Sequence, residues 1–213
     1  MTLERPDVTL HGWIVNADSS GPLIIYFGGN AEEVSRLVDT FAPLEASTVL
    51  MNYRGYGRSG GRPTAAALLD DARALVEEMP QRLGADRPLI LFGRSLGSGI
   101  AAQTTRHARA DGVILLSPYR SLTRLAQRYA PGMPARWLLR HRIDTTAALD
   151  TLPDQVLVFY SPTDLIIPAD ESRALIERLE PPPRVVTFDG GHNMPMHDAQ
   201  IWPAVEAFVA EAT

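Results

Sequence analysis

The sequence predicts an α/β fold, in which a mostly parallel sheet of about seven strands has helices on both faces. Two observations lead to this prediction. Short apolar runs, typical of strands buried on both faces, alternate along the chain with segments whose apolar residues recur at helical spacing. One of these runs passes directly into a glycine-flanked serine and then a helix. The 213 residues suffice for one substantial core, so we expect a single domain over residues 1–213.

The strands are expected from runs of apolar and β-branched residues. In chain order they cover residues 9–17, 23–27, 48–53, 89–92, 112–116, 156–160 and 184–188. The first run alternates between apolar and polar residues only in part, as an outer strand does. The others are nearly continuous apolar runs, which indicates strands that are covered on both faces.

The helices are expected where apolar residues return every three or four positions. In chain order they cover residues 32–41, 64–83, a segment from 98 onward, 169–179 and 199–212. In the longest helix the apolar stripe includes Leu68, Leu75 and Met79, and Thr64 stands where an N-cap is needed.

Residues 119–150 interrupt this alternation. The segment spans about thirty residues between two strands, far more than an ordinary connection. We expect a small helical insertion, a cap, over the carboxyl edge of the sheet, where ligands bind in open α/β folds. Arg120, Arg124 and Arg128 would share one helical face there. They form either a solvated face or a surface that steers an anionic substrate.

Composition excludes several classes of function. A net charge of −5 argues against nucleic acid as the main partner. Without cysteine the chain has neither disulfides nor a thiol nucleophile, which suits a reducing compartment. Residues 1–13 carry acids and a proline where a signal peptide would be apolar, and no apolar run approaches the ~18 residues that cross a bilayer. We therefore expect a cytoplasmic protein without a transmembrane segment.

The serine motif G-x-S-x-G occurs twice. At residues 93–97, GRSLG, it lies between an apolar strand and a helix, which is the context of a nucleophile elbow. At residues 57–61, GRSGG, no strand leads into Ser59, and two glycines and a proline follow it. We therefore predict Ser95 as the nucleophile, exposed at the carboxyl edge of the sheet.

A serine nucleophile needs a histidine base, which in this fold follows the last strand. His192 comes directly after the strand at 184–188, in a glycine-flanked loop, and it is the predicted base. His197 is the reserve candidate, although it lies beyond Met194 and Pro195. The remaining histidines precede the expected place: His11, His107 and His141.

The base needs an acid that orients it, and this acid should follow the penultimate strand. Asp164 stands in the loop that leaves the strand at 156–160. Asp170 is better explained as the cap of the next helix, and Asp189 would have to fold back on His192. We therefore predict Asp164 as the third member of the triad.

Two backbone N–H groups should stabilise the oxyanion that forms when Ser95 attacks a carbonyl carbon. We predict the amides of Leu96 and Asn30 for this oxyanion hole. Gly28 and Gly29 would let the backbone approach closely, although they also fit a plain tight turn. The chemistry needs no metal or organic cofactor, and no residues at ligand spacing suggest one.

Five segments together resemble the α/β-hydrolase superfamily, in particular its small serine-aminopeptidase-like or abhydrolase-domain proteins. They are FGGNA, NYRGYGRSGGRP, GRSLGSG, SPTD and GGHN, and the resemblance covers nearly the whole chain. It implies the triad above, and it implies that residues 52–57 form a loop that braces the oxyanion region, so that Arg54 and Tyr56 are structural rather than catalytic. Members usually have histidine at the position of Gly28. We expect their first strand to be missing or very short here, and we expect no membrane anchor ahead of the domain.

The predicted residues indicate a serine hydrolase that cleaves a carboxylic ester or thioester of a small acyl substrate through an acyl-enzyme. Two alternatives remain open. The same triad could cleave an amide or peptide bond, as the family label suggests. The fold could also serve a binding protein without turnover. The sequence says nothing about oligomeric state.

Overall fold

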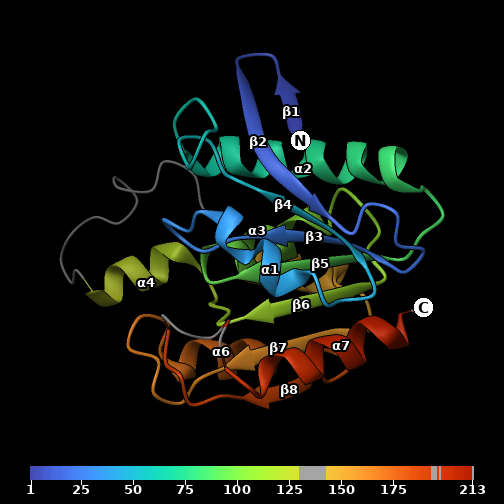
Figure 1. Cartoon of the computed structure of the whole chain (residues 1–213). Helices are drawn as coiled ribbons and strands as arrows, with labels where there is room; N and C mark the ends of the chain where they lie inside the picture. The colour runs from blue at the N-terminus through green and yellow to red at the C-terminus, as the bar shows by residue number, and fades with distance from the viewer. Residues whose placement is uncertain (130–142, 193–195, 197, 213) are drawn as a thin grey trace.

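The computed structural model describes residues 1–129, 143–192, 196 and 198–212 of the chain. Its centre is an eight-stranded sheet with the strand order β1-β2-β4-β3-β5-β6-β7-β8 (Figure 1). From β4 to β8 the neighbouring strands are parallel, whereas β1 and β2 run antiparallel to their neighbours. The predicted α/β fold with a mostly parallel sheet is confirmed.

The seven expected strands are present, and an eighth precedes them. The strands are β1 (Thr2–Arg5), β2 (Val8–Val15), β3 (Leu23–Phe27), β4 (Ser47–Met51), β5 (Leu89–Arg94), β6 (Gly112–Leu116), β7 (Val156–Tyr160) and β8 (Arg184–Thr187). β1 is only four residues long and carries two charged residues, so its sequence gives no strand signal. It forms because it pairs with β2, with Thr2 opposite His11, and because Leu3 is buried in the core.

The helices of the described residues follow the expected order. Most are shorter than expected, but the helix after Ser95 begins at Leu96, before the expected start at residue 98. They are η1 (Val34–Leu37), α1 (Val38–Phe41), α2 (Ala65–Leu83), α3 (Leu96–Thr104), α4 (Leu122–Tyr129), η2 (Thr145–Thr151), α6 (Ala169–Ile176) and α7 (Ile201–Glu211). Thr64 caps α2 as predicted, since its side chain accepts a hydrogen bond from Ala67 N at 3.3 Å.

The prediction of a single helix at residues 32–41 is wrong, because the segment forms a short 3₁₀ helix followed by one turn of α-helix. The side chain of Glu33 accepts from the backbone N–H of Ser35 and so starts the turn at Val34. The side chain of Glu32 instead turns back toward Gly29, which it contacts through a hydrogen bond of 2.6 Å.

Helices cover both faces of the sheet, as expected. Alternate residues of each strand point to opposite faces: Ile25 lies in the core under α2, α3 and α6, and Ile24 lies under α1 and α7. All five residues of β3 are buried. Burying each apolar side chain of this kind contributes about 1.5 to 3 kcal/mol, which explains why such runs form the centre of the sheet.

The path of the chain places a topological switch point at the carboxyl edge of the sheet. From β3 the chain passes to β4 on one side and then to β5 on the other, so the direction of winding reverses between β3 and β5. Ligand sites in open α/β sheets lie at such a reversal, outside the carboxyl ends of the strands. The loop after β3 and the turn after β5 both reach this point.

The insertion expected at residues 119–150 is only partly described. Its ends contain α4 and η2, and α4 lies at the side toward which the arrows of β5 and β6 point (Figure 1). Residues 130–142, including Trp137 and His141, lie outside the described residues.

In the part of the chain that the structure describes, no helix is long and apolar enough to span a bilayer.

Candidate active site

Ser95 lies in a sharp turn between β5 and α3. Its backbone has φ 51° and ψ −117°, a strained conformation for a residue with a side chain. The flanking glycines make the turn possible. A Cβ on Gly93 would lie 2.2 Å from the carbonyl oxygen of Gly97, and a Cβ on Gly97 would lie 1.9 Å from that of Phe27. Only glycine fits at either position, which gives the G-x-S-x-G spacing a steric cause.

The structure brings Ser95, His192 and Asp164 together. Ser95 Oγ lies 2.9 Å from His192 Nε2, and His192 Nδ1 lies 2.8 Å from Asp164 Oδ2. Asp164 stands in the loop after β7 and His192 in the loop after β8, at the carboxyl edge that Ser95 also occupies. Three residues that are far apart in the sequence therefore form one continuous series of hydrogen bonds.

Asp164 is held as a buried carboxylate. Burial raises the pKa of this group, but hydrogen bonds from His192 and from the backbone of Ile167 and Ile166 outweigh burial, so the net pKa lies below its usual value of 3.8. Both backbone bonds end on Oδ1 and measure 2.8 Å. A carboxylate only accepts hydrogen bonds, so His192 Nδ1 carries the proton and Nε2 accepts from the Ser95 hydroxyl.

The loop predicted to contribute to the oxyanion hole lies beside Ser95. A Cβ on Gly29 would lie 3.7 Å from Ser95 Cβ, so the absence of a side chain lets the two segments approach. Tyr53 and Tyr56 brace this loop: Tyr53 donates to the carbonyl of Gly28 at 2.9 Å, and Tyr56 donates to Asn30 Oδ1 at 2.8 Å. The other amide donor expected here, that of Leu96, belongs to the first residue of α3.

Comparison with known proteins places the chain in a family. A family model described as "Serine aminopeptidase, S33" matches residues 23–143, more than half of the chain. The chain belongs to this family of α/β hydrolases. An uncharacterized protein of Mycobacterium tuberculosis is 31% identical over 211 residues, which cover 95% of this chain and 75% of that protein.

Two further similarities extend the comparison of this α/β hydrolase. Lysophosphatidylserine lipase ABHD12 of Danio rerio is 32% identical over 130 residues, which cover 56% of this chain and 34% of the lipase. Among solved structures, Est1E from Butyrivibrio proteoclasticus with ferulic acid bound has a TM-score of 0.76 at 17% identity, and the match covers 100% of this chain and 98% of that one. At that identity the likeness supports the fold alone.

The second serine motif of this α/β hydrolase has a structural explanation. Ser59 Oγ accepts from the backbone N–H of His11 at 2.9 Å and donates to the carbonyl of Asn52 at 2.8 Å. The hydroxyl of Ser59 is thus occupied both as an acceptor and as a donor by backbone groups.

Two of the other candidate residues predicted from the sequence, His197 and His141, lie outside the described residues. The side chain of Asp189 is exposed.

The contacts of Tyr56 and Arg54 agree with the structural role expected for both. Tyr56 contacts the loop after β3 directly, through Asn30. Arg54 forms ion pairs with Asp71 and Asp7, both at 2.6 Å, and so fastens its own loop to α2. Sequence reasoning missed Tyr53, as well as Glu32 and Arg94, which also contact the loops around Ser95. Long-range contacts of this kind leave no local signal.

The arginines of the insertion are matched by carboxylates of α6. Arg120 pairs with Glu171 at 2.6 Å, Arg124 lies 3.4 Å from the same carboxylate, and Arg128 pairs with Asp170. These pairs attach α4 to α6, the helix that follows the loop of Asp164. The sequence left two roles open for these arginines, a solvated face or a surface that steers an anionic substrate. Their pairing with Glu171 and Asp170 is neither of these, and it argues against the binding of an anionic substrate.

Glu171 is expected to make stability depend on pH. Burial raises the pKa of this carboxyl, but hydrogen bonds from Arg120 and the charges of Arg120 and Arg124 lower it more, so the net pKa lies below 4.5. Such a group stabilises the fold above its unfolded pKa, and the contribution is lost as the pH falls through the folded pKa. We expect Glu171→Gln to lower the free energy of unfolding by about 2 kcal/mol at pH 7.

Urea denaturation at pH 7 and at a pH below 4.5 measures this effect. The difference between wild type and Glu171→Gln should shrink at the lower pH, because the wild type loses the contribution there. The control is Asp170→Asn, whose side chain is 56% exposed and which should cost less than about 1 kcal/mol. If the free energies of unfolding of wild type and Glu171→Gln differ by the same amount at both pH values, the pH-dependent role of Glu171 is contradicted.

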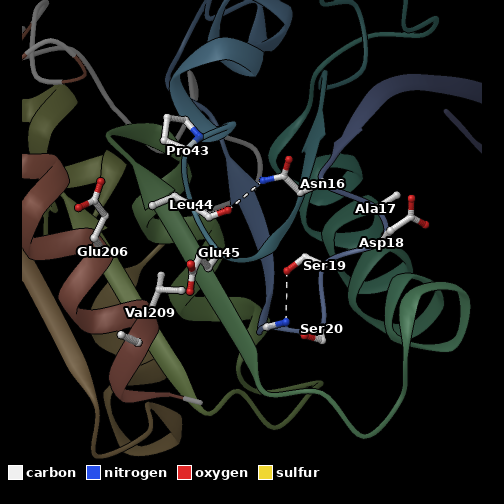
Figure 2. Close-up of a pocket in the computed structure, with 12 residues that line it drawn as sticks. Asn16, Ala17, Asp18, Ser19, Ser20, Pro43, Leu44, Glu45, Glu206 and Val209 are labelled. Atoms are coloured by element: carbon white, nitrogen blue, oxygen red, sulfur yellow. Dashed lines mark hydrogen bonds between the residues drawn. The ribbon is translucent and has the colours of Figure 1, made fainter.

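A pocket of about 1230 Å³ is lined by none of the three predicted triad residues. Figure 2 shows the residues that line it. The pocket is lined by the turn before β3, the segment before β4 and the end of α7, including Asp18, Glu45 and Glu206. These segments lie at the amino ends of the strands, whereas Ser95 lies at the carboxyl ends.

Within the described residues, no group of three or more histidines and acids is arranged to hold a metal ion.

Proposed function

We propose that this chain is a serine hydrolase that cleaves a carboxylic ester or thioester of a small acyl substrate. Ser95 would be the nucleophile, His192 the base and Asp164 the residue that orients the base. The observation that carries the proposal is the pair of hydrogen bonds of 2.9 and 2.8 Å that links these three side chains. Nucleophilic catalysis by serine requires a hydroxyl that is hydrogen-bonded to a base, and a base that is hydrogen-bonded to an acid. It also requires that the serine be exposed in a sharp strand-to-helix turn.

The proposed reaction proceeds through an acyl-enzyme. Ser95 Oγ attacks the carbonyl carbon while its proton passes to His192 Nε2, and the imidazolium is stabilised by the carboxylate of Asp164. When the tetrahedral intermediate collapses, Nε2 gives this proton to the departing alcohol or thiol. A water molecule then attacks the acyl carbonyl carbon and loses a proton to Nε2. When this second intermediate collapses, the carboxylic acid departs and Nε2 returns the proton to Ser95 Oγ.

The amides of Leu96 and Asn30 are proposed to stabilise the negative oxygen of the intermediate. Leu96 is the first residue of α3, and amides in the first turn of a helix have no partner within the helix. The positive end of the helix dipole adds to this stabilisation. Asn30 belongs to the loop that Tyr53 and Tyr56 brace beside Ser95. Preorganised donors of this kind supply a large part of catalysis in acyl transfer.

The name of one similar protein favours an ester as the substrate, and the family label favours an amide. ABHD12 of Danio rerio is named a lysophosphatidylserine lipase. The matching family model is named for a serine aminopeptidase, so cleavage of an amide by the same triad is the second candidate. A single domain, a cap at residues 119–150 and a cytoplasmic location stay part of the proposal.

Hydrolysis of a substrate panel tests the proposed function. The panel contains p-nitrophenyl esters of increasing acyl length, the matching phenyl thioesters and aminoacyl p-nitroanilides, and each is assayed with wild type and Ser95→Ala. We expect turnover of esters or thioesters that is lost in the variant. Turnover of anilides without esters would make the protein an amidase. Failure of every substrate would favour a binding protein.

A further inference from the structure

A largely buried ion pair connects the loops on the two sides of Ser95. Arg94, the residue before Ser95, contacts Glu32 Oε1 through Nη1, and the two side chains are only 13% and 11% exposed. The other carboxylate oxygen, Oε2, accepts from the backbone N–H of Gly29 at 2.6 Å and from the hydroxyl of Tyr26 at 2.9 Å. Glu32 is thereby fastened both to the sheet and to the loop of the predicted oxyanion hole.

The same arginine also contacts the segment that contains the proposed base. Arg94 Nη2 donates to the carbonyl oxygen of His192 at 3.0 Å. One guanidinium group therefore spans the loop after β3 and the loop after β8, and it does so from the residue next to the proposed nucleophile. The planar fork of arginine suits this task, because its two terminal nitrogens donate in different directions.

Position 28 explains how the carboxylate reaches this place. A Cβ on Gly28 would lie 2.9 Å from Glu32 Oε2 and 3.3 Å from Val34 Cγ1. The absence of a side chain at Gly28 leaves this space to the Glu32 carboxylate. A larger residue at position 28 would displace the carboxylate from Gly29 and Tyr26.

The charges around Glu32 and Arg94 indicate that this ion pair positions the two loops and contributes little to stability. A buried ion pair is weak evidence of stabilisation, because removing both charges from water costs about as much as their attraction returns. Arg94 Nε is buried and has no hydrogen-bond partner, which is a further cost. Burial raises the pKa of Tyr26, and the negative charge of Glu32 raises it further, so the phenol stays protonated and donates to the carboxylate.

We propose that Glu32 and Arg94 act as one positioning pair, which fixes the distance between the oxyanion loop and His192. The inference rests on the proposed function, since it concerns the alignment of that catalytic apparatus. Neither residue touches the reacting atoms. Arg94 holds the backbone of His192, and Glu32 holds the backbone of Gly29, so the loss of either partner breaks the connection between the two loops.

Kinetics of Arg94→Gln, Glu32→Gln and the double variant test the pair on the best substrate of the panel. We expect each single variant to lower kcat by about 10- to 100-fold, because displacement of a catalytic group by about 1 Å costs up to 100-fold. KM should change by less than about threefold, since the substrate contacts remain. The double variant should lose no more than the worse single variant, because the residues act as a unit.

Arg94→Lys provides the test should Arg94→Gln not fold. Lysine keeps the positive charge beside Glu32 but has a single terminal nitrogen, so we expect kcat between those of wild type and Arg94→Gln. The matched control is Arg87→Gln, two residues before the start of β5. Arg87 donates to the carbonyls of Gly21 at 2.7 Å and Leu83 at 2.9 Å, far from Ser95. Its loss should leave kcat within about twofold.

A spectroscopic measurement separates this inference from the proposed function. The low-field proton NMR signal of His192 Nδ1–H reports the bond to Asp164 without any substrate. We expect Arg94→Gln to shift or broaden it and Arg87→Gln to leave it unchanged. Should wild type cleave no substrate while this difference holds, the pair stands and the hydrolase proposal fails. An unchanged signal with kcat within threefold, or fully additive losses in the double variant, would overturn the pair.

Discussion

Replacement of Ser95 by alanine is expected to lower kcat for the best ester substrate by about 10⁴-fold or more. The variant removes the oxygen that would form the acyl-enzyme and leaves the oxyanion donors, so only weak residual catalysis remains. The fold should persist, because alanine fits the space of serine and the Ser95 backbone still donates to Leu116 O. Steady-state kinetics with matched thermal denaturation measure both properties.

Ser59→Ala is the matched control, since it lies in the other G-x-S-x-G segment of the chain. Its hydroxyl joins the backbones of His11 and Asn52, so its loss affects stability more than chemistry. We expect kcat within about tenfold of wild type. A large loss in Ser59→Ala together with an active Ser95→Ala would mean that the wrong serine was assigned.

Asp164→Asn is expected to lower kcat by about 10⁴-fold, although the side chain changes little in size or polarity. In the wild type, Oδ1 accepts two backbone N–H groups and Oδ2 accepts the Nδ1 proton of His192. Asparagine would keep its carbonyl oxygen on the two backbone amides and turn its NH₂ group toward Nδ1. The imidazole would then carry its proton on Nε2, where it cannot accept the proton of Ser95.

The control for this variant is Asp189→Asn. Asp189 is the acid that lies three residues before His192, but its side chain is exposed. We expect kcat within about threefold of wild type, because surface substitutions of this kind have small effects. Equal activity of wild type and Asp164→Asn in steady-state assays would contradict the role assigned to Asp164.

Much of the fold is predictable because its central strands are nearly continuous apolar runs. The five residues of β3 and the run before Ser95 are buried on both faces, so local composition alone reveals them. β1 is different: Thr2–Arg5 becomes a strand only through its pairing with β2, which a local pattern does not encode. The turn at residues 32–41 likewise depends on how Glu32 and Glu33 bond to nearby backbone groups.

The candidate site divides in the same way. The places of Ser95, Asp164 and His192 follow from the strands that precede them, so their meeting at one edge could be expected from topology. The contacts of Arg94 with Glu32 and His192 could not, because they join side chains and backbones whose distances only the folded chain defines. The same holds for Tyr53 and Gly28.

Covalent labelling with a fluorophosphonate tests the central claim most directly, because such probes react with a serine only when a base activates it. The proposal predicts one adduct per chain in wild type, mapped by mass spectrometry to the peptide that contains Ser95, and no adduct in Ser95→Ala. Labelling that persists unchanged in Ser95→Ala, or an adduct on the peptide of Ser59, would contradict it.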